Sequence, residues 1–454
     1  MLIKKVKAEG LAHLSYLVGS DGRAAVIDPR RDCHVYLDIA DGEKLRITHI
    51  LETHRNEDYV TGSRELASMT GAAILHGDNA FGYGQPVREG DTIDLGQAVL
   101  KALATPGHTL DSMSYVLYDR SAGPQPVGVF TGDALFVGEV GRTDLFGEER
   151  IGQMAPLLFD SLHDKLLSLG EGTIIYPAHG AGSACGGSIS DREESTIGLE
   201  MAQNKALTIG SREAFVAMKK AEVMEKPYYF ARMEEINLAG QPVLGSLPRP
   251  PQLSPGEFER LIGAGAAVLD VRAPTSFAGG HIEGSVSIPR EVLPSYAGWV
   301  LEYGRPIVLV TDGPEEVSEV VRMLIRIGYD DIIGHLGEGM EGWAKRGLPI
   351  ASFPLVTPTE LHGMLGREEN ILVLDVRTEK EWRAERVERS MHIFAGYLRD
   401  RIDEVPRGTR VAVMCSSGLR GSLGAGILQD AGYEVLNILG GTGGWKKAGL
   451  PLEK

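Results

Sequence analysis

Short apolar runs separated by polar loops dominate the first half of the chain. Residues 14–18 and 24–27 flank a glycine-containing turn, which predicts a pair of antiparallel strands. Residues 47–52 predict a further strand, and residues 63–69 predict a helix that ends at Gly71. More strands are expected at 98–104, 114–118, 127–131 and 173–176, and helices at 154–168 and 212–219.

Four of these strands run directly into polar loops, which are residues 53–63, 105–109, 131–133 and 176–180. They carry His54, His108, Asp133 and His179, and glycines in the flanks let the backbone approach an ion closely. A lone histidine is more often a surface or core residue than a ligand, and eight of the other nine histidines are interpreted in that way. Polar groups on strand-end loops gather where proteins build functional sites, so the four loops together predict a metal site.

The second half of the chain contains an internal repeat that follows a Pro-rich segment. Val-Leu-Asp-Val-Arg occurs at 268–272 and again at 373–377, and the Gly-Trp segment that ends at Trp343 returns at Trp445. Each copy alternates apolar strand candidates with helical stretches, which predicts two small α/β domains with parallel sheets. We therefore predict domains at 1–240, 256–352 and 356–454, with a linker at 241–255.

Composition narrows the classes of function. The chain has 454 residues, is 43% apolar and carries a formal charge of −16, so a nucleic-acid partner is not expected. No apolar run approaches the ~20 residues of a membrane span, and the first residues lack the apolar core of a signal peptide, which predicts a cytoplasmic protein without a membrane partner. The three cysteines lie far apart and do not predict disulfides.

The loop that starts at His54 resembles the metallo-β-lactamase superfamily, together with Pro-Gly-His-Thr around His108 and Thr-Gly-Asp at Asp133. This resemblance implies an αββα sandwich with metal at one edge of two sheets. The first loop of the superfamily normally reads His-x-His-x-Asp-His, but here Asn56 and Tyr59 replace two histidines. Because neither is a good zinc ligand, we expect a single ion held by His54, His108 and Asp133.

Two imidazoles and one carboxylate form the set associated with non-haem Fe(II) oxygenases. Asp58 and His179 would then orient ligands or water beside the ion.

Residues 130–135 and 141–144 read Phe-Thr-Gly-Asp-Ala-Leu and Gly-Arg-Thr-Asp, and they resemble the persulfide dioxygenases of this superfamily. The resemblance implies one Fe(II) per chain and a contact between Arg142 and a thiol substrate; structural pairing of Arg142 with Asp144 is the alternative. Zinc remains the alternative metal. Cys185 lies six residues after His179 and is interpreted as a small buried residue or as a possible sulfur carrier.

A second constellation lies at Cys415, which follows a buried strand and precedes a helix. Backbone N–H groups and a helix N-terminus stabilise a thiolate there and bind anions, and Arg420 adds positive charge. With Asp-Val-Arg at 375–377 and the closing Gly-Trp segment, the domain resembles a rhodanese, which implies a persulfide on Cys415. The loop residues Ser416, Ser417, Gly418 and Leu419 would bind substrate. Cysteine phosphatases use a similar loop, but they place arginine six residues after cysteine instead of five.

The first copy of the repeat has Asp312 at the cysteine position and no arginine that closes its loop. We interpret this copy as an inactive rhodanese-like domain that serves as a scaffold or docking surface.

The combination predicts oxidation of a low-molecular-weight persulfide, of glutathione, coenzyme A or a similar thiol, by O2 to sulfite and thiol. Sulfur transfer that involves sulfite and thiosulfate would follow, and a homo-oligomer is expected. The alternatives are a glyoxalase-II-like zinc-dependent thioester hydrolase fused to a sulfurtransferase, and a sulfur-carrier module whose first domain only binds.

Overall fold

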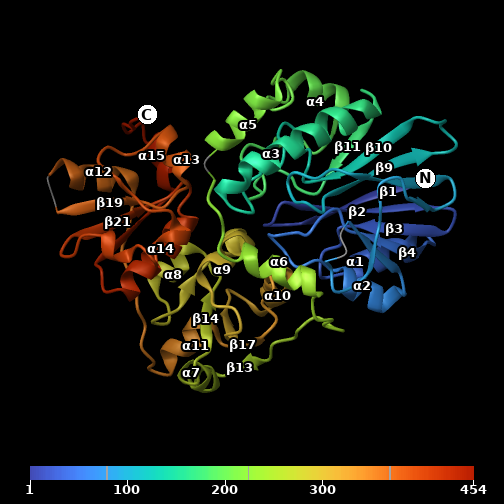
Figure 1. Cartoon of the computed structure of the whole chain (residues 1–454). Helices are drawn as coiled ribbons and strands as arrows, with labels where there is room; N and C mark the ends of the chain where they lie inside the picture. Colours follow the sequence, from blue (N-terminus) through green and yellow to red (C-terminus); the bar gives the residue numbers. More distant parts are fainter. Residues whose placement is uncertain (78–79, 223, 368–369) are drawn as a thin grey trace. The chain divides into compact units, whose positions relative to one another are not determined.

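The computed structural model describes residues 1–77, 80–222, 224–367 and 370–454. The chain divides into two compact units (Figure 1). The N-terminal unit contains Met1–Glu222, Tyr228–Ser246 and Ile325–Ile327, and the C-terminal unit contains residues 224–227, Leu247–Leu324 and the described part of Gly328–Lys454.

Two six-stranded sheets form the centre of the N-terminal unit. The first sheet has the order β1 (Leu2–Ala8), β2 (His13–Ser20), β3 (Arg23–Ile27), β4 (Arg46–Leu51), β5 (Ala73–His76) and β6 (Gln85–Pro86). The second has the order β12 (Ser195–Thr196), β11 (Ile174–Pro177), β10 (Pro126–Gly132), β9 (Met113–Asp119), β8 (Ala98–Ala104) and β7 (Thr92–Asp94). Strands β2 and β3 pair antiparallel, as their apolar runs predicted.

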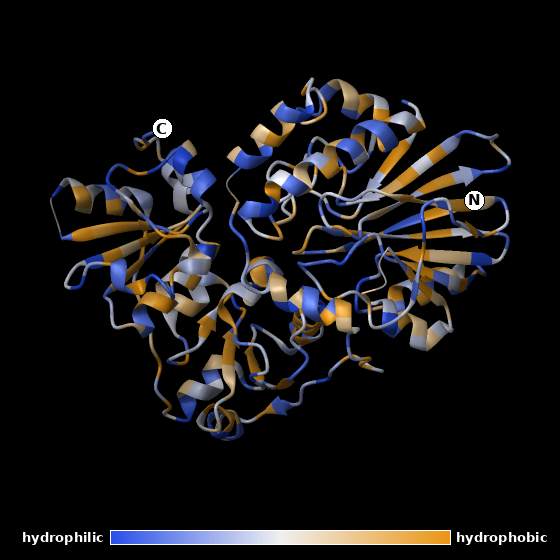
Figure 2. Ribbon diagram, viewed as in Figure 1, coloured by the Kyte–Doolittle hydropathy of each residue, from blue (hydrophilic) through white to orange (hydrophobic). Residues whose placement is uncertain are grey.

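Helices cover the outer face of each sheet. The side chains along each strand alternate between the core that separates the two sheets and the side that faces the helices, so both faces need to be covered. Along β9, Tyr115 and Leu117 enter the core between the sheets, while Val116 faces the helical side of the second sheet. On β3, Ala25 and Ile27 likewise join the central core, and the alternate residues of the strand face the other way. Apolar residues therefore occur on both faces of the strands, and much of the strand ribbon in Figure 2 has the orange colour of hydrophobic residues.

The helices on the first sheet are α1 (His34–Gly42) and α2 (Ser63–Thr70), and those on the second include α3 (Ile151–Asp160) and α5 (Arg212–Ala221). The helix predicted at 154–168 continues from α3 through a π-helical turn (Ser161–Leu166) and a 3₁₀ turn (Leu167–Leu169). Two more helices, α4 (Ile197–Gln203) and α6 (Phe230–Ala239), complete the unit. This arrangement is the predicted αββα sandwich.

The C-terminal unit contains two five-stranded sheets with the same strand order. The first is β13 (Gln252–Leu253), β17 (Ile332–Leu336), β16 (Ile307–Val310), β14 (Ala267–Asp270) and β15 (Val286–Ser287). The second is β18 (Leu355–Val356), β22 (Val435–Ile438), β21 (Arg410–Met414), β19 (Ile371–Asp375) and β20 (Met391–His392). Every described strand pair of these sheets is parallel, which confirms the α/β prediction for both copies.

The helices of the first copy are α7 (Pro255–Gly263), α8 (Pro274–Gly279), α9 (Leu293–Val300), α10 (Val317–Arg326) and α11 (Gly339–Lys345). Those of the second are α12 (Pro358–Gly366), α13 (Glu379–Ala384), α14 (Leu419–Asp430) and α15 (Gly441–Lys447). Both α7 and α12 begin with a capping box and a proline, so the last proline of the predicted linker starts a helix. Within the described ranges, none of the helices is long and apolar enough to cross a membrane.

Candidate functional sites

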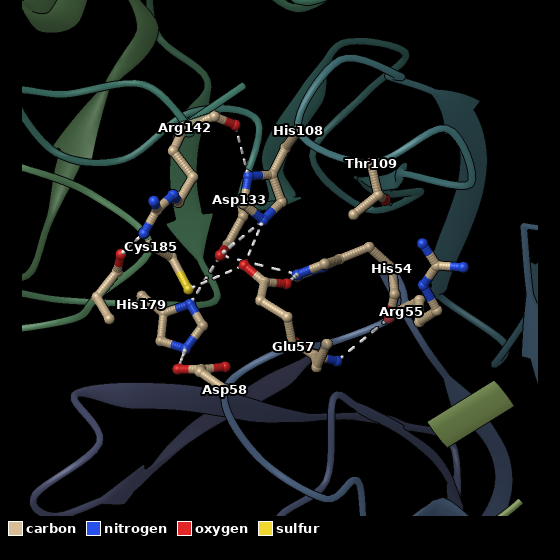
Figure 3. A network of polar contacts seen from close by, with 12 residues as sticks. His54, Arg55, Glu57, Asp58, His108, Thr109, Asp133, Arg142, His179 and Cys185 are labelled. Atoms are coloured by element: carbon tan, nitrogen blue, oxygen red, sulfur yellow. Dashed lines mark hydrogen bonds and ion pairs between the residues drawn. The ribbon is translucent and has the colours of Figure 1, made fainter. Parts of the chain in front are cut away.

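The four polar loops of the N-terminal unit meet at one end of its two sheets. His54 follows β4, His108 lies between β8 and β9, Asp133 follows β10, and His179 follows β11. All four side chains are buried. Figure 3 shows them pointing toward one another.

Two histidine nitrogens converge on one carboxylate oxygen. The Nε2 atoms of His54 and His108 lie 3.7 and 3.5 Å from Oδ2 of Asp133. Among the described residues, neither Nε2 atom has a hydrogen-bond partner. Buried polar atoms without partners are costly, and a divalent cation between these three donors would satisfy both nitrogens. The donor types fit a metal ion, and of the three predicted ligands His108 and Asp133 belong to a group whose ligand atoms all lie within 4.8 Å of one another, with Glu57 and Cys185.

The opposite nitrogen of each histidine is held by the protein. Nδ1 of His108 donates to the carbonyl oxygen of Arg142 at 3.0 Å, and Nδ1 of His54 lies 2.9 Å from Thr53 Oγ1. The Thr53 hydroxyl in turn lies 2.8 Å from a carboxylate oxygen of Asp28, to which it donates. It therefore accepts from His54 Nδ1, and this chain of bonds leaves the Nε2 lone pair free for an ion.

His179 bridges two carboxylates. Its Nδ1 lies 2.8 Å from Asp133 Oδ1, and its Nε2 lies 3.0 Å from Asp58 Oδ2. Burial opposes charge on this ring, but Asp133 and Asp58 outweigh it and raise the histidine pKa well above its usual value. His179 thus contacts both carboxylates directly, and the proposed roles of His179 and Asp58 in orienting ligands stay predictions.

Cys185 lies within this group of side chains. Its Sγ is 3.3 Å from Glu57 Oε1, and the ligand atoms of Glu57, His108, Asp133 and Cys185 all lie within 4.8 Å of one another. Burial, followed by the nearby carboxylates, raises the thiol pKa of Cys185 well above its usual value. The sequence analysis considered Cys185 but missed Glu57.

Arg142 makes contacts that connect the loops. Its guanidinium forms two hydrogen bonds with Asp144, at 2.6 and 2.7 Å, and donates to the carbonyl oxygen of Ala184 at 2.9 Å. The side chain is 1% exposed, and its backbone carbonyl holds His108. This arrangement matches the structural alternative for Arg142, and its role in binding a substrate stays a prediction.

Asn56 and Tyr59 occupy the positions of the replaced histidines. The Asn56 side chain donates to the backbone oxygen of His54 at 3.2 Å, and the Tyr59 ring stacks on His13 with 4.0 Å between centroids. Both residues therefore have structural contacts.

The second site lies at the carboxyl end of β21. Cys415 is buried, and its Sγ accepts a hydrogen bond from the backbone N–H of Gly418 at 3.0 Å. Gly418 has a φ of 101°, which favours glycine, and immediately precedes α14. One backbone N–H of the Cys415 loop therefore contacts the sulfur next to the N-terminus of a helix, and the binding of substrate by this loop stays a prediction.

Arg420 is paired within this site. Its guanidinium makes two 2.7 Å hydrogen bonds with Glu381 of α13 and a third with Ser416 Oγ, also at 2.7 Å. It also hydrogen-bonds Tyr296, which belongs to α9 of the first copy. Glu381 and Tyr296 were missed because they lie far from Cys415 in the sequence, and Glu381 offsets part of the positive charge expected at Arg420.

The glycine-rich turn before Trp445 supports the same loop. Thr442 donates its backbone N–H to the carbonyl oxygen of Cys415 at 2.7 Å, and Gly443 donates to Ser416 at 2.9 Å. In the first copy, the loop at the corresponding position contains an internal hydrogen bond, in which the backbone N–H of Asp312 donates to the Glu316 carboxylate at 3.2 Å. That loop has no sulfur and no arginine, consistent with an inactive copy.

Both the N-terminal and the C-terminal half of the chain match known protein families. Residues 8–179 match the metallo-β-lactamase superfamily, and residues 254–346 and 357–448 match the rhodanese-like domain. The mitochondrial persulfide dioxygenase ETHE1 of Bos taurus is 33% identical over 218 residues, which are 45% of this chain and 76% of that protein. A hydroxyacylglutathione hydrolase of Rhodospirillum rubrum is 38% identical over 162 residues, which are 35% of this chain but only 57% of that protein.

A solved structure covers more of the chain than these relatives. The metallo-β-lactamase from Staphylococcus aureus subsp. aureus COL is 34% identical, with a TM-score of 0.66 over 74% of this chain and 98% of that protein. The chain therefore belongs to the family of metallo-β-lactamase-fold persulfide dioxygenases and carries two rhodanese-like domains after that fold.

Proposed function

We propose that the N-terminal unit uses one Fe(II) ion to oxidise a low-molecular-weight thiol persulfide with O2, and that the second rhodanese-like domain transfers sulfur through Cys415. In the first reaction, R-S-SH, O2 and water give R-SH and sulfite, with release of two protons from sulfurous acid. Glutathione and coenzyme A are the thiol carriers that we propose first.

One observation supports this choice most strongly. His54, His108 and Asp133 bring two imidazoles and a carboxylate together, while Asn56 and Tyr59 stand where a second ion would need histidines. Two histidines with one carboxylate suit non-haem Fe(II) oxygenases, whereas hydrolytic members of the superfamily use paired zinc ions. When bound, the iron would supply the redox chemistry that activates O2.

The side chains of this unit would prepare the ion site. Thr53 and the carbonyl of Arg142 hold the rings of His54 and His108 so that Nε2 faces the ion. His179 fixes the Asp133 carboxylate, and burial of all these groups excludes bulk water. Exclusion of water strengthens their electrostatic interactions and protects a reactive persulfide from side reactions.

Sulfur transfer would use the loop at Cys415. Sulfite attacks the outer sulfur of a Cys415 persulfide, the S–S bond breaks, and the products are thiosulfate and the Cys415 thiolate. The reverse reaction loads the cysteine from thiosulfate. The Gly418 N–H, which contacts Sγ at 3.0 Å, stabilises negative charge on the sulfur in either direction.

The direct test loads purified full-length protein with Fe(II) under anaerobic conditions and then supplies glutathione persulfide and O2. We expect O2 uptake and sulfite release in equal amounts, and loss of both in His108→Ala. No uptake by protein that contains one iron per chain would refute the proposal.

A zinc-dependent thioester hydrolase is the second candidate, favoured by the 38% identity with the hydroxyacylglutathione hydrolase of Rhodospirillum rubrum. It predicts about two zinc ions per chain in the isolated protein and hydrolysis of S-lactoylglutathione. Metal analysis of protein purified without added metal distinguishes the two candidates, because the dioxygenase requires one iron.

A further inference from the structure

Glu57 is a buried carboxylate in the centre of the candidate metal site to which the expected ligand set assigns no role. Its side chain is 1% exposed, and it lies in the loop after β4, between Asn56 and Asp58. In Figure 3, its carboxylate points toward His108 and His54, whereas the neighbouring Asp58 points toward His179. The two adjacent acidic residues therefore serve different parts of the site.

The distances place Glu57 among the donors of one ion. Its Oε1 lies 3.0 Å from His108 Nε2, and its Oε2 lies 3.8 Å from His54 Nε2. Ligands at about 2.0–2.2 Å from a common ion are separated from each other by roughly 3–3.6 Å when they are adjacent. The 3.5 Å between His108 Nε2 and Asp133 Oδ2 falls in this range, while the distances of His54 Nε2 to Asp133 and to Glu57, at 3.7 and 3.8 Å, lie slightly above it.

The partners of the carboxylate are those of a metal ligand. Its ion pairs among the described residues are with the two histidines, Oε1 also accepts a hydrogen bond from Cys185 Sγ at 3.3 Å, and Oε2 has no hydrogen-bond partner among the described residues. A buried carboxylate needs a compensating positive charge, because its desolvation costs several kcal/mol. A cation bound between the imidazoles would supply this charge and would leave both rings neutral, which is the form that binds metal.

We infer that Glu57 is a fourth protein ligand of the ion, with His54, His108 and Asp133. This inference rests on the proposed metal site and increases the number of its protein ligands from three to four. With Glu57 bound, the ion would keep one fewer open position for substrate and O2 than with three protein ligands.

The experiment measures metal binding directly, without turnover. Metal-free full-length protein is titrated with Co(II) under anaerobic conditions, because the visible bands of Co(II) change in position and intensity with coordination number. Glu57→Gln keeps the size of the side chain but removes its charge, and it is expected to raise the Kd of Co(II) by at least ~10-fold and to alter the bands. Glu57→Asp keeps the charge, and its Kd for Co(II) is expected to lie between those of the wild type and Glu57→Gln.

Glu52→Gln is the matched control. Glu52 is a buried carboxylate in the same unit, but it accepts hydrogen bonds from Tyr83 at 2.8 and 3.0 Å and has no described ion pair with a histidine. The Glu52→Gln variant should bind Co(II) with the Kd of the wild type. The His108→Ala variant shows the change in Kd that the loss of one ligand causes.

The outcomes separate this inference from the proposed function. Wild-type protein that binds no metal would overturn both. A wild-type Kd and unchanged bands in Glu57→Gln would overturn the role of Glu57 alone. A thiolate-to-Co(II) charge-transfer band that disappears in Cys185→Ser, together with unchanged binding in Glu57→Gln, would assign the fourth position to Cys185 instead.

Discussion

A single methyl group at Gly441 should inactivate sulfur transfer. Gly441 is the first residue of α15 and has a φ of 52°, and a Cβ placed on it would lie 2.0 Å from the carbonyl oxygen of Cys415. Because Cβ atoms essentially never approach other heavy atoms closer than 3.0 Å, the turn and the Cys415 loop must separate by at least 3.0 − 2.0 = 1.0 Å. The hydrogen bond from Thr442 to that same carbonyl would be lost.

The first copy provides a control with the same backbone. Gly339 begins α11 at the matching position of the repeat, with a φ of 58°, but a Cβ there would meet no atom within 4 Å. Both substitutions to alanine carry the cost of a left-handed conformation, roughly 1–2 kcal/mol. Only Gly441→Ala adds the displacement of the loop that carries the sulfur, and a displacement of ~1 Å at a reacting group can reduce the rate ~100-fold.

We therefore expect Gly441→Ala to lower kcat/KM for thiosulfate–cyanide transfer by ~100-fold and Gly339→Ala to change it by less than ~3-fold. Tryptophan fluorescence reports folding of this unit alone, because all four tryptophans of the chain lie between Trp299 and Trp445. Native fluorescence with a wild-type rate in Gly441→Ala would refute the reasoning, as would an equal loss in Gly339→Ala.

Three further predictions follow from the two sites. Thr53→Val removes the hydroxyl that holds His54, and it should weaken iron binding ~10–100-fold in a competition titration, whereas Thr53→Ser should not. Cys415→Ser should abolish thiosulfate–cyanide transfer but leave O2 uptake intact; full residual transfer would point to another cysteine. Burial opposes ionisation of Glu381, but hydrogen bonds from Arg420 lower its pKa to about 2 from 4.5. Because the folded-state pKa is the lower one, this pair stabilises the fold above pH 4.5 and loses its effect as the pH falls toward 2. For side chains that are 35% and 12% exposed, we expect about 1 kcal/mol between wild type and Glu381→Gln in urea unfolding at pH 7, disappearing near pH 2–3.

Most strands and the Cys415 loop could be predicted from short stretches of sequence, because apolar runs and glycines determine the local backbone conformation within a few residues. Strand β1 was missed because Lys4, Lys5 and Lys7 dilute its apolar residues, as is common for an edge strand. Glu57 was missed for a different reason. Sequence cannot tell which of two adjacent acidic side chains faces the histidines, since that depends on the path of the loop between two sheets.

The same limit applies to the second rhodanese-like domain. Tyr296 and Glu381 reach Arg420 from residues 124 and 39 positions earlier in the chain, and no local pattern relates them to it. Only the packing of α9 and α13 near the Cys415 loop brings the three side chains together.

Comparison of the two copies separates the residues that build the fold from those that act on sulfur. Asp375 and Arg377 helped to identify the rhodanese, yet the first copy holds the same buried pair, with Arg272 and Asp270 joined at 2.6 Å and the second pair at 2.7 Å.

The tryptophans repeat as well. Trp343 and Trp445 each donate to a proline carbonyl at 2.8 Å, six residues further on. Because the first copy retains these contacts without the loop cysteine and arginine, we assign them to the stability of the sheet and the last helix. The proposed sulfur transfer should then depend on features that the first copy lacks, which include Cys415, Arg420 and the close approach of Gly441 to the loop.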